Sequence, residues 1–432
     1  MLHGNTAKDS RRAWLVTILL AIFMVINFLD KAVLGIVGIS MMEDLHIEPE
    51  QFGAIASSFF LFFSLSAIGF GLLADRMSTK VLLLICALIW TISQVPLALT
   101  ASVPVLYFSR VLLGIGEGPA YPLSLHACYK WFPNDRRNIP SAVIFQGVII
   151  GLLIAGPLLT YIMVNHSWHA AFGFLAAASA AWMVVWFILG KDGNLIATSS
   201  QVRQAGETVK KCPISYKKLL TDRTFFGNMI LYWAAYWIFA VMFTWIPSYL
   251  GKILHYDATA VGWMFMLFML VNIPISLGGS WISHILLFKG FSSKLARGGL
   301  TCLCTILGGL CLFAAIYLVE TPFLKVIVLA LGCNLPQIAF VLSSTIVAEI
   351  SPKGTESALI SINSAIATTG GLVAPALTGY FIQNSATTAI GYNTGFLVAG
   401  ALLIVIGCVG FWLVNPAVTQ KRFLILANQA HG

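Results

Sequence analysis

Four charged residues lie inside stretches that are otherwise apolar enough to be embedded in lipid. Asp30 and Lys31 fall in AWLVTILLAIFMVINFLDKAVLG, and Arg110 and Glu117 fall in VLYFSRVLLGIGEGPAYPLSL. A charge at the centre of a membrane costs roughly 2.5–3.5 kcal/mol even on the translocon scale, so such residues normally line a water-filled path. Two carboxyl groups and two cations at this depth could carry protons and hold an anion.

The spacing of these charges indicates how they could act together. Arg110 and Glu117 are seven residues apart, about two turns of a helix, so both should project from roughly the same face. Asp30 and Lys31 are adjacent, hence about 100° apart around the helix axis. We expect Lys31 to face a central cavity and Asp30 to face the span that carries Arg110 and Glu117. Protonation of Asp30 or Glu117 would then free a basic residue to bind an anion.

The structural alternative is a buried ion network that only holds two helices together. Such networks exist, but apolar residues pack helices without the desolvation penalty that charges carry. Four charges in two membrane spans are therefore a costly way to achieve packing alone. We therefore favour a role of these charges in moving protons and an anion through the membrane.

The elements that must position these charges are membrane-spanning helices. The chain has 432 residues, of which 59% are hydrophobic and 9% charged, and its mean hydropathy is +0.89. This composition excludes an ordinary soluble domain. We expect an all-α membrane protein with twelve transmembrane helices, each long enough to cross about 30 Å of hydrocarbon. They are predicted at residues 13–35, 52–73, 81–100, 104–127, 139–163, 168–189, 225–250, 260–287, 298–318, 324–349, 357–382 and 393–414.

The distribution of basic residues predicts the orientation. With both termini inside, 21 of the 25 Lys and Arg residues fall in inner segments, and only Lys252 and Lys325 fall outside. The remaining two are Lys31 and Arg110, within the spans. The positive-inside rule therefore predicts cytoplasmic termini. The net charge of +9 comes from basic residues on the inner side, so we expect membrane lipids as their partners and no binding of nucleic acid.

A single long polar connection divides the chain. We predict an N-terminal six-helix bundle at residues 1–190, a cytoplasmic linker at 191–223 and a C-terminal six-helix bundle at 224–432. Two bundles joined in this way are typical of transporters that bind substrate between their halves. The end of the linker, PISYKKLLTDR, predicts a basic helix on the inner membrane surface.

Several segments resemble the major facilitator superfamily. The turn GFGLLADRMSTK resembles the loop signature that follows the second span of that family, and Asp75 and Arg76 within it would form a conformational latch. Within the superfamily the chain is similar to the anion:cation symporters, which include bacterial sugar-acid carriers. The similar segments are NFLDKAVLG, SRVLLGIGEGPAYPLSLHACYKWFPNDRR, FTWIPSYL and GGLVAPALTGYFIQ.

The resemblance implies roles for the four charges. Proton coupling would fall on Asp30 and Glu117, and binding of the anion on Lys31 with support from Arg110. The family often has Arg at the position of Lys31, and a lysine cannot bind a carboxylate bidentately. Sugar-acid carriers have a tyrosine where this chain has Phe63, so one hydroxyl is missing. A short, aromatic or sulfonated acid is therefore as compatible with the sequence as a sugar acid.

Further polar residues within the spans could contact the substrate. Tyr121 follows Glu117 by four residues and should share its face. The alternative role is packing for Tyr121 and hydrogen bonding between helices for the other polar residues. The predicted substrate contacts are Tyr121, Gln146, Ser344, Asn363 and Ser364.

The sequence thus predicts a proton-coupled symporter that imports a small organic anion across the bacterial inner membrane as a monomer. The chain lacks the phosphate-binding loop of ATPases and the motifs of intramembrane hydrolases, so we expect no enzymatic activity, cofactor or metal. An anion exchanger is one alternative. A drug/proton antiporter is another, because GLLIAGP partly resembles the antiporter motif. A non-transporting membrane sensor is the third.

Overall fold

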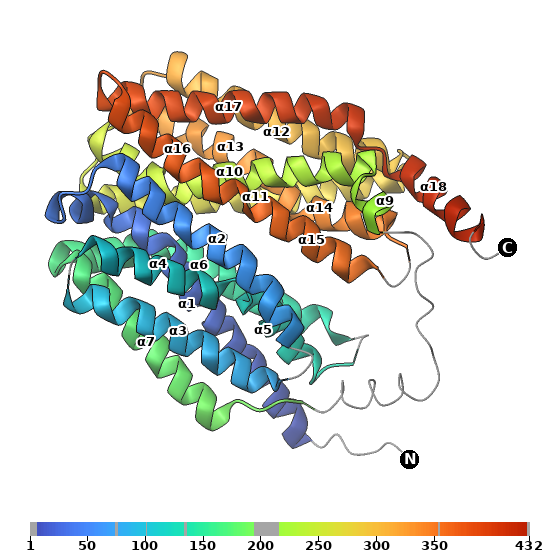
Figure 1. Ribbon diagram of the computed structural model, residues 1–432, viewed down its shortest axis with the longest axis horizontal. Coiled ribbons are helices and arrows are strands. Elements are labelled where there is room, and N and C mark those ends of the chain that lie inside the picture. The colour runs from blue at the N-terminus through green and yellow to red at the C-terminus, as the bar shows by residue number, and fades with distance from the viewer. Residues whose placement is uncertain are drawn as a thin grey trace. The chain divides into compact units, whose positions relative to one another are not determined.

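The structure is a computed structural model that describes residues 7–73, 77–100, 102–133, 136–193, 216–352 and 355–429. In these ranges the ordered elements are helices, without a strand (Figure 1). The predicted latch residues Asp75 and Arg76 lie outside the described residues, as does most of the predicted linker.

The helices coincide with the predicted spans. Up to residue 193 they are α1 (Ala7–Asp44), α2 (Pro49–Leu73), α3 (Thr79–Leu99), α4 (Val103–Glu117), α5 (Ala120–Tyr129), α6 (Asn138–Asn165) and α7 (Trp168–Leu189). From residue 216 they are α9 (Tyr216–Leu220), α10 (Arg223–Lys252), α11 (Ala258–Phe288), η2 (Lys294–Gly299), α12 (Leu300–Tyr317), α13 (Pro322–Asn334), η3 (Leu335–Ile338), α14 (Ala339–Ile350), α15 (Glu356–Thr368), α16 (Gly370–Asn384), α17 (Thr388–Leu413) and α18 (Pro416–Gln429).

Ten helical segments among the described residues are long and apolar enough to cross a membrane. The other two predicted spans, 52–73 and 104–127, correspond to α2 and to α4 with α5. The span at 104–127 is divided at Gly118 and Pro119, because proline cannot donate the helical hydrogen bond and clashes with the preceding turn. The span at 324–349 is divided in the same way at Pro336, within η3.

The described chain forms two compact units. Unit 1 contains residues 1–47, 58–208 and 256–266, and unit 2 contains residues 48–57, 209–255 and 267–432. The two predicted six-helix bundles and their boundaries at 190 and 224 stay a prediction.

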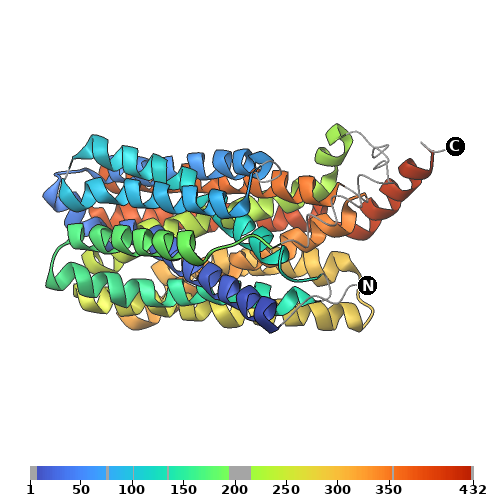
Figure 2. The ribbon, with the colours of Figure 1, turned by 90° about the horizontal axis from the view of Figure 1, so that it is seen from below.

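In unit 1, α1 packs along α6, and α3 packs between α4 and α7 (Figure 1). The second view shows α1 in dark blue beside the green α7 (Figure 2). Glycine permits the close approach of α1 and α6, since a Cβ atom at Gly147 would lie 2.1 Å from the Ala21 carbonyl oxygen. This contact fixes the helix that carries Asp30 and Lys31.

In unit 2, α10 packs against α16 and α17, and α12 packs against α17. The end of the predicted linker forms the short helix α9, followed by Asp222 as the N-cap of α10. The carboxylate of Asp222 accepts hydrogen bonds from the Thr224 amide (2.8 Å) and from the Thr419 hydroxyl of α18 (2.9 Å). The start of α10 and the C-terminal helix are therefore joined through the Asp222 side chain, and the Thr224 and Thr419 hydroxyls form a second link at 2.8 Å.

Candidate functional site

The four predicted charges form one buried cluster in unit 1. Asp30 is 0% exposed, Glu117 is 1% exposed and Arg110 is 2% exposed. The side chain of Lys31 retains 11% exposure. All three other charges act electrostatically on Asp30. The structure thus brings together the groups that the sequence placed in two separate spans.

The sequence GIGEG explains how α4 reaches its position beside α2. A Cβ atom at Gly114 would lie 2.4 Å from the Phe59 carbonyl oxygen, and one at Gly118 would lie 2.2 Å from the Phe63 carbonyl oxygen. Any side chain at either position would therefore separate the two helices. Two glycines one turn apart give α4 a smooth face against the α2 backbone.

The central glycine of the same motif packs against α3. A Cβ atom at Gly116 would lie 2.8 Å from Cδ1 of Trp90. With α2 and α3 occupying two sides of α4, Glu117 extends from a third side toward α1. Local sequence therefore determines the direction of the glutamate side chain.

Lys31 is held by one carboxylate, one amide and two aromatic rings. Its Nζ lies 2.8 Å from Oε2 of Glu117 and donates to Oδ1 of Asn27 at 2.5 Å. The same ammonium lies 4.5 Å from the ring centroid of Phe28 and 5.4 Å from that of Phe63. Aromatic faces attract cations most strongly where water is excluded. Phe63, which stands where a tyrosine was expected, therefore contacts the cation without offering it a hydroxyl.

The predicted orientation of the adjacent charges on α1 is wrong in one respect. Asp30 was expected to face the charges of α4, and Lys31 a cavity, but it is Lys31 that pairs with Glu117. The long lysine side chain can reach α4 from its own face of α1. The shorter Asp30 side chain instead reaches α3.

Gln94 of α3 is the partner of Asp30. Its Nε2 donates to Oδ1 of Asp30 at 2.9 Å, and Gln94 is 0% exposed. Sequence reasoning did not single out this residue. The available signal was an amide inside the apolar stretch LLLICALIWTISQVPLAL, where a polar side chain requires a partner.

Arg110 is the cation of the cluster with unused hydrogen-bond donors. Its Nε and Nη2 atoms are buried and have no hydrogen-bond partner among the described residues. The guanidinium carbon lies 5.6 Å from the ring centroid of Phe172 on α7. A buried donor without an acceptor is costly, and it costs most when it carries a charge. An anion that entered this site would satisfy it.

The remaining predicted contacts in unit 1 are less buried. Tyr121 is 38% exposed and lies in the first turn of α5, after the division at Gly118 and Pro119. Gln146 on α6 is also exposed. Neither belongs to the buried cluster of charges.

Unit 2 contains a separate buried polar cluster. Asn228 Nδ2 and Asn363 Nδ2 each donate to Oγ of Ser343 at 2.8 Å. These residues belong to α10, α14 and α15, so the predicted contact Asn363 is engaged in bonding between helices. Ser344 and Ser364 are half-buried, and the hydroxyl of Ser364 interacts with that of Tyr232.

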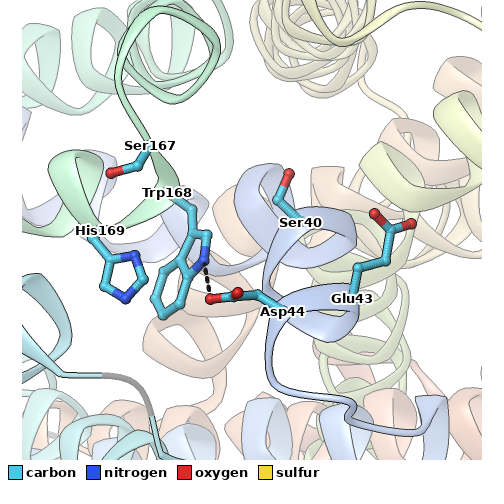
Figure 3. A pocket seen from close by; sticks show the side chains of 6 residues that line it. All are labelled: Ser40, Glu43, Asp44, Ser167, Trp168 and His169. Atoms are coloured by element: carbon cyan, nitrogen blue, oxygen red, sulfur yellow. Dashed lines mark hydrogen bonds between the residues drawn. The ribbon is translucent and has the colours of Figure 1, made fainter.

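A hollow of about 530 Å³ lies where α1 ends and α7 begins (Figure 3). Trp168 donates from Nε1 to Oδ2 of Asp44 at 3.1 Å, and its ring stacks on that of His169. Asp44 is 13 residues beyond Lys31 on the same helix, or about 20 Å at 1.5 Å per residue. The hollow is thus distinct from the cluster of charges. Its lining residues are Ser40, Glu43, Asp44, Ser167, Trp168 and His169.

Many apolar helical spans with a buried cluster of mixed charge among them are typical of a multi-pass membrane transporter. The sequence pattern of the Major Facilitator Superfamily matches residues 20–336. The chain therefore belongs to the major facilitator superfamily, and it is a transporter rather than an enzyme.

Curated relatives match almost the whole chain. A hexuronate transporter of Bacillus subtilis (strain 168) is 25% identical over 408 residues, covering 91% of this chain and 93% of the relative. A D-galactonate transporter of Escherichia coli O6:H1 is 26% identical, covering 92% and 96%. The probable sulfoacetate transporter SauU of Cupriavidus necator is 24% identical, covering 91% and 92%.

Solved structures show the same fold. An inward-facing bacterial homologue of the human lysosomal transporter Spinster has a TM-score of 0.77 at 15% identity, covering 98% of this chain and 99% of that one. A D-xylose–proton symporter has a TM-score of 0.75 at 14% identity, covering 94% and 98%. The predicted fold class is confirmed.

Proposed function

We propose that this protein is a proton-coupled symporter that imports a small organic anion. The observation that carries the proposal is the buried cluster of two carboxyl groups and two cations, in which Arg110 has two unpartnered N–H groups. Relatives described as transporters of hexuronate, D-galactonate and sulfoacetate support an anionic substrate. We place the protein in the bacterial inner membrane as a monomer, with both termini cytoplasmic.

The ion pair between Lys31 and Glu117 provides the coupling step. While Glu117 is ionised, its Oε2 at 2.8 Å neutralises the lysine and competes with any other anion. A proton on Glu117 removes its negative charge. The Lys31 ammonium is then no longer neutralised and can bind another anion. Substrate binding to Lys31 and protonation of Glu117 are therefore mutually favourable. Asp30 is the other proposed proton site, and its charge acts electrostatically on Arg110 without a direct ion pair.

The surroundings of Lys31 favour a compact anionic group. The ammonium presents a point charge rather than a bidentate fork, so a sulfonate and a carboxylate are both suitable ligands. The rings of Phe28 and Phe63 add apolar surface beside that charge. Sugar acids, short or aromatic carboxylates and sulfonates form the proposed substrate range.

The less buried polar residues are the proposed contacts for the rest of the substrate. In unit 1 these are Tyr121 and Gln146, both exposed. In unit 2 they are Ser344 and Ser364, both half-buried. Asn363 is 0% exposed and bonded to Ser343, so it would contribute only by giving up that bond.

The test uses purified protein in liposomes that contain a pH-sensitive dye. A hexonate, a short dicarboxylate, an aromatic carboxylate and sulfoacetate are added outside in turn, and internal acidification is recorded. We expect acidification with at least one acid, and its loss in Glu117→Gln. Asp44→Asn is the matched control, because it makes the same carboxyl-to-amide change on α1 outside the cluster, and it should acidify like the wild type.

Three outcomes would contradict the proposal. Counterflow of labelled anion without proton movement would indicate an exchanger, and acidification that persists in Glu117→Gln would remove that residue from coupling. Export of cationic drugs with uptake of protons would indicate an antiporter.

A further inference from the structure

Asp30 and Gln94 form a contact in which each residue keeps one unused oxygen. Both are 0% exposed, and Gln94 Nε2 donates to Asp30 Oδ1 at 2.9 Å. Asp30 Oδ2 and Gln94 Oε1 have no hydrogen-bond partner among the described residues. Both unused atoms are acceptors, so they cannot bond to each other while Asp30 is a carboxylate.

A proton on Asp30 changes this relationship. A carboxylic acid has one O–H donor, and the carboxamide of Gln94 has a free acceptor in Oε1. Gln94 can therefore bond to Asp30 in both protonation states, donating to the carboxylate and accepting from the acid. An arginine has donors only, so Arg110 bonds strongly to the carboxylate and has no acceptor for the acid.

The contacts of Arg110 show which partner Asp30 has taken. Asp30 and Arg110 act on each other electrostatically, yet no hydrogen bond or ion pair within 4.0 Å joins these two described residues. Asp30 bonds to Gln94 instead, and Nε and Nη2 of Arg110 have no acceptor. This is the arrangement in which the guanidinium is available to an incoming anion.

We propose that Gln94 is a positioning residue that holds Asp30 away from Arg110, so that the guanidinium is free to bind the substrate anion. The inference rests on the proposed symport, in which Arg110 supports anion binding. Protonation of Asp30 allows a second hydrogen bond, from its O–H to Oε1 of Gln94, and weakens the attraction of Arg110. Gln94 thus keeps Arg110 available when Asp30 is ionised as well as when it is protonated, and without Gln94 the availability of Arg110 would depend on the proton.

The titratable groups around Asp30 come from several helices. Lys31 lies on α1, and Arg110 and Glu117 lie on α4. Among the helices that pack against α1, α6 carries no acidic or basic residue in its range, and α7 carries only His169, in its first turn. Helix α5 carries His126 and the tyrosines at 121 and 129. A pH response of the site therefore has four candidate sources, which are Asp30, Lys31, Glu117 and His126.

The experiment measures the affinity of the purified protein for a labelled anion across a range of pH, in detergent and without a gradient. The anion is whichever of the four acids of the transport test binds to the wild type. In Gln94→Leu, Asp30 loses the partner that competes with Arg110, and the ion pair forms. We expect affinity to fall about tenfold in neutral buffer and to recover in acidic buffer, where Asp30 is protonated. Gln94→Met, of similar volume, should behave alike if the leucine variant does not fold.

Two further variants separate positioning from folding. Ser93→Ala alters a buried α3 side chain that bonds to its own helix, through Oγ to the Trp90 carbonyl at 2.8 Å, and should keep the wild-type pH profile. Asp30→Asn imitates the protonated acid, so adding Gln94→Leu to it should not change the pH profile further. A Gln94→Leu profile that matches the wild type at every pH would overturn the inference, even where less protein folds.

The inference and the proposed function fail in distinguishable ways. If the wild type binds the anion but moves no protons in liposomes, symport is wrong. If the wild type couples normally and neither Gln94 variant shifts the pH profile of binding, Gln94 is structural and the inference alone is wrong.

Discussion

The ammonium of Lys31 lies 2.8 Å from Oε2 of Glu117, and the two side chains are 11% and 0% exposed. Breaking such a buried pair on one side leaves an uncompensated charge, whereas replacing both partners removes the problem. The contribution of this pair to the free energy of unfolding can therefore be measured independently of transport.

Lys31→Met should destabilise the protein by about 3–5 kcal/mol, because Glu117 is left buried without its cation. The double variant Lys31→Met/Glu117→Gln should recover most of that loss. Thermal unfolding of the purified protein checks both. The deficit of the single variant should shrink in acidic buffer, where Glu117 takes up a proton, and equal deficits at all pH values would show that the pair does not carry the effect.

Gly118→Ala should destabilise the packing of α4 on α2. Its Cβ atom would lie 2.2 Å from the Phe63 carbonyl oxygen, a backbone atom that cannot move aside like a flexible side chain. We expect a loss of about 1–3 kcal/mol, as for other overpacked sites. Gly278→Ala is the control, because nothing lies within 4 Å of that position. Equal melting temperatures for the two variants would contradict the close helix contact.

Hydrocarbon thickness made the helices of this protein predictable. The predicted span 168–189 coincides with α7, since an apolar run of that length has no alternative in lipid. The divisions at Pro119 and Pro336 lie inside apolar runs, and hydropathy alone does not detect them. The prolines themselves were the signal.

The membership of the buried cluster was predictable, but its pairing was not. Spacing along a helix gives the angle between Asp30 and Lys31 and not the rotation of α1 relative to α3 and α4. Side-chain length then decided that Lys31 reaches Glu117. Gln94 was missed because a lone amide in an apolar span looks the same whether it serves packing or a functional carboxylate.

Asp222→Ala should weaken the attachment of α18. The carboxylate caps α10 through the Thr224 amide and also accepts from the Thr419 hydroxyl. Its ion pair with Arg422 adds little, since that side chain is 54% exposed. We expect about 1–2 kcal/mol lost from the cap and faster proteolysis within α18.

Asp257→Ala is the matched control for the cap. Asp257 Oδ1 accepts from the Ala260 amide at the start of α11, at 2.9 Å, and is exposed. This variant should lose the stabilisation that the cap gives to α11, and cleavage within α18 should not become faster. Similar cleavage of α18 in both variants would show that Asp222 does not anchor the helix.

Phe63→Tyr should change substrate preference. The ring of Phe63 lies 5.4 Å from the Lys31 ammonium, so a hydroxyl on it would place a hydrogen-bonding group beside the proposed anion site. We expect the variant to gain about fivefold in affinity for a polyhydroxylated hexonate relative to an aromatic carboxylate, which is the effect of one hydrogen bond. Competition of unlabelled acids against labelled substrate in counterflow measures that ratio.

Phe108→Tyr adds the same hydroxyl to a ring of α4 that is 56% exposed, and it should leave the ratio unchanged. If Phe63→Tyr also leaves it unchanged, the missing hydroxyl at position 63 does not set the substrate range.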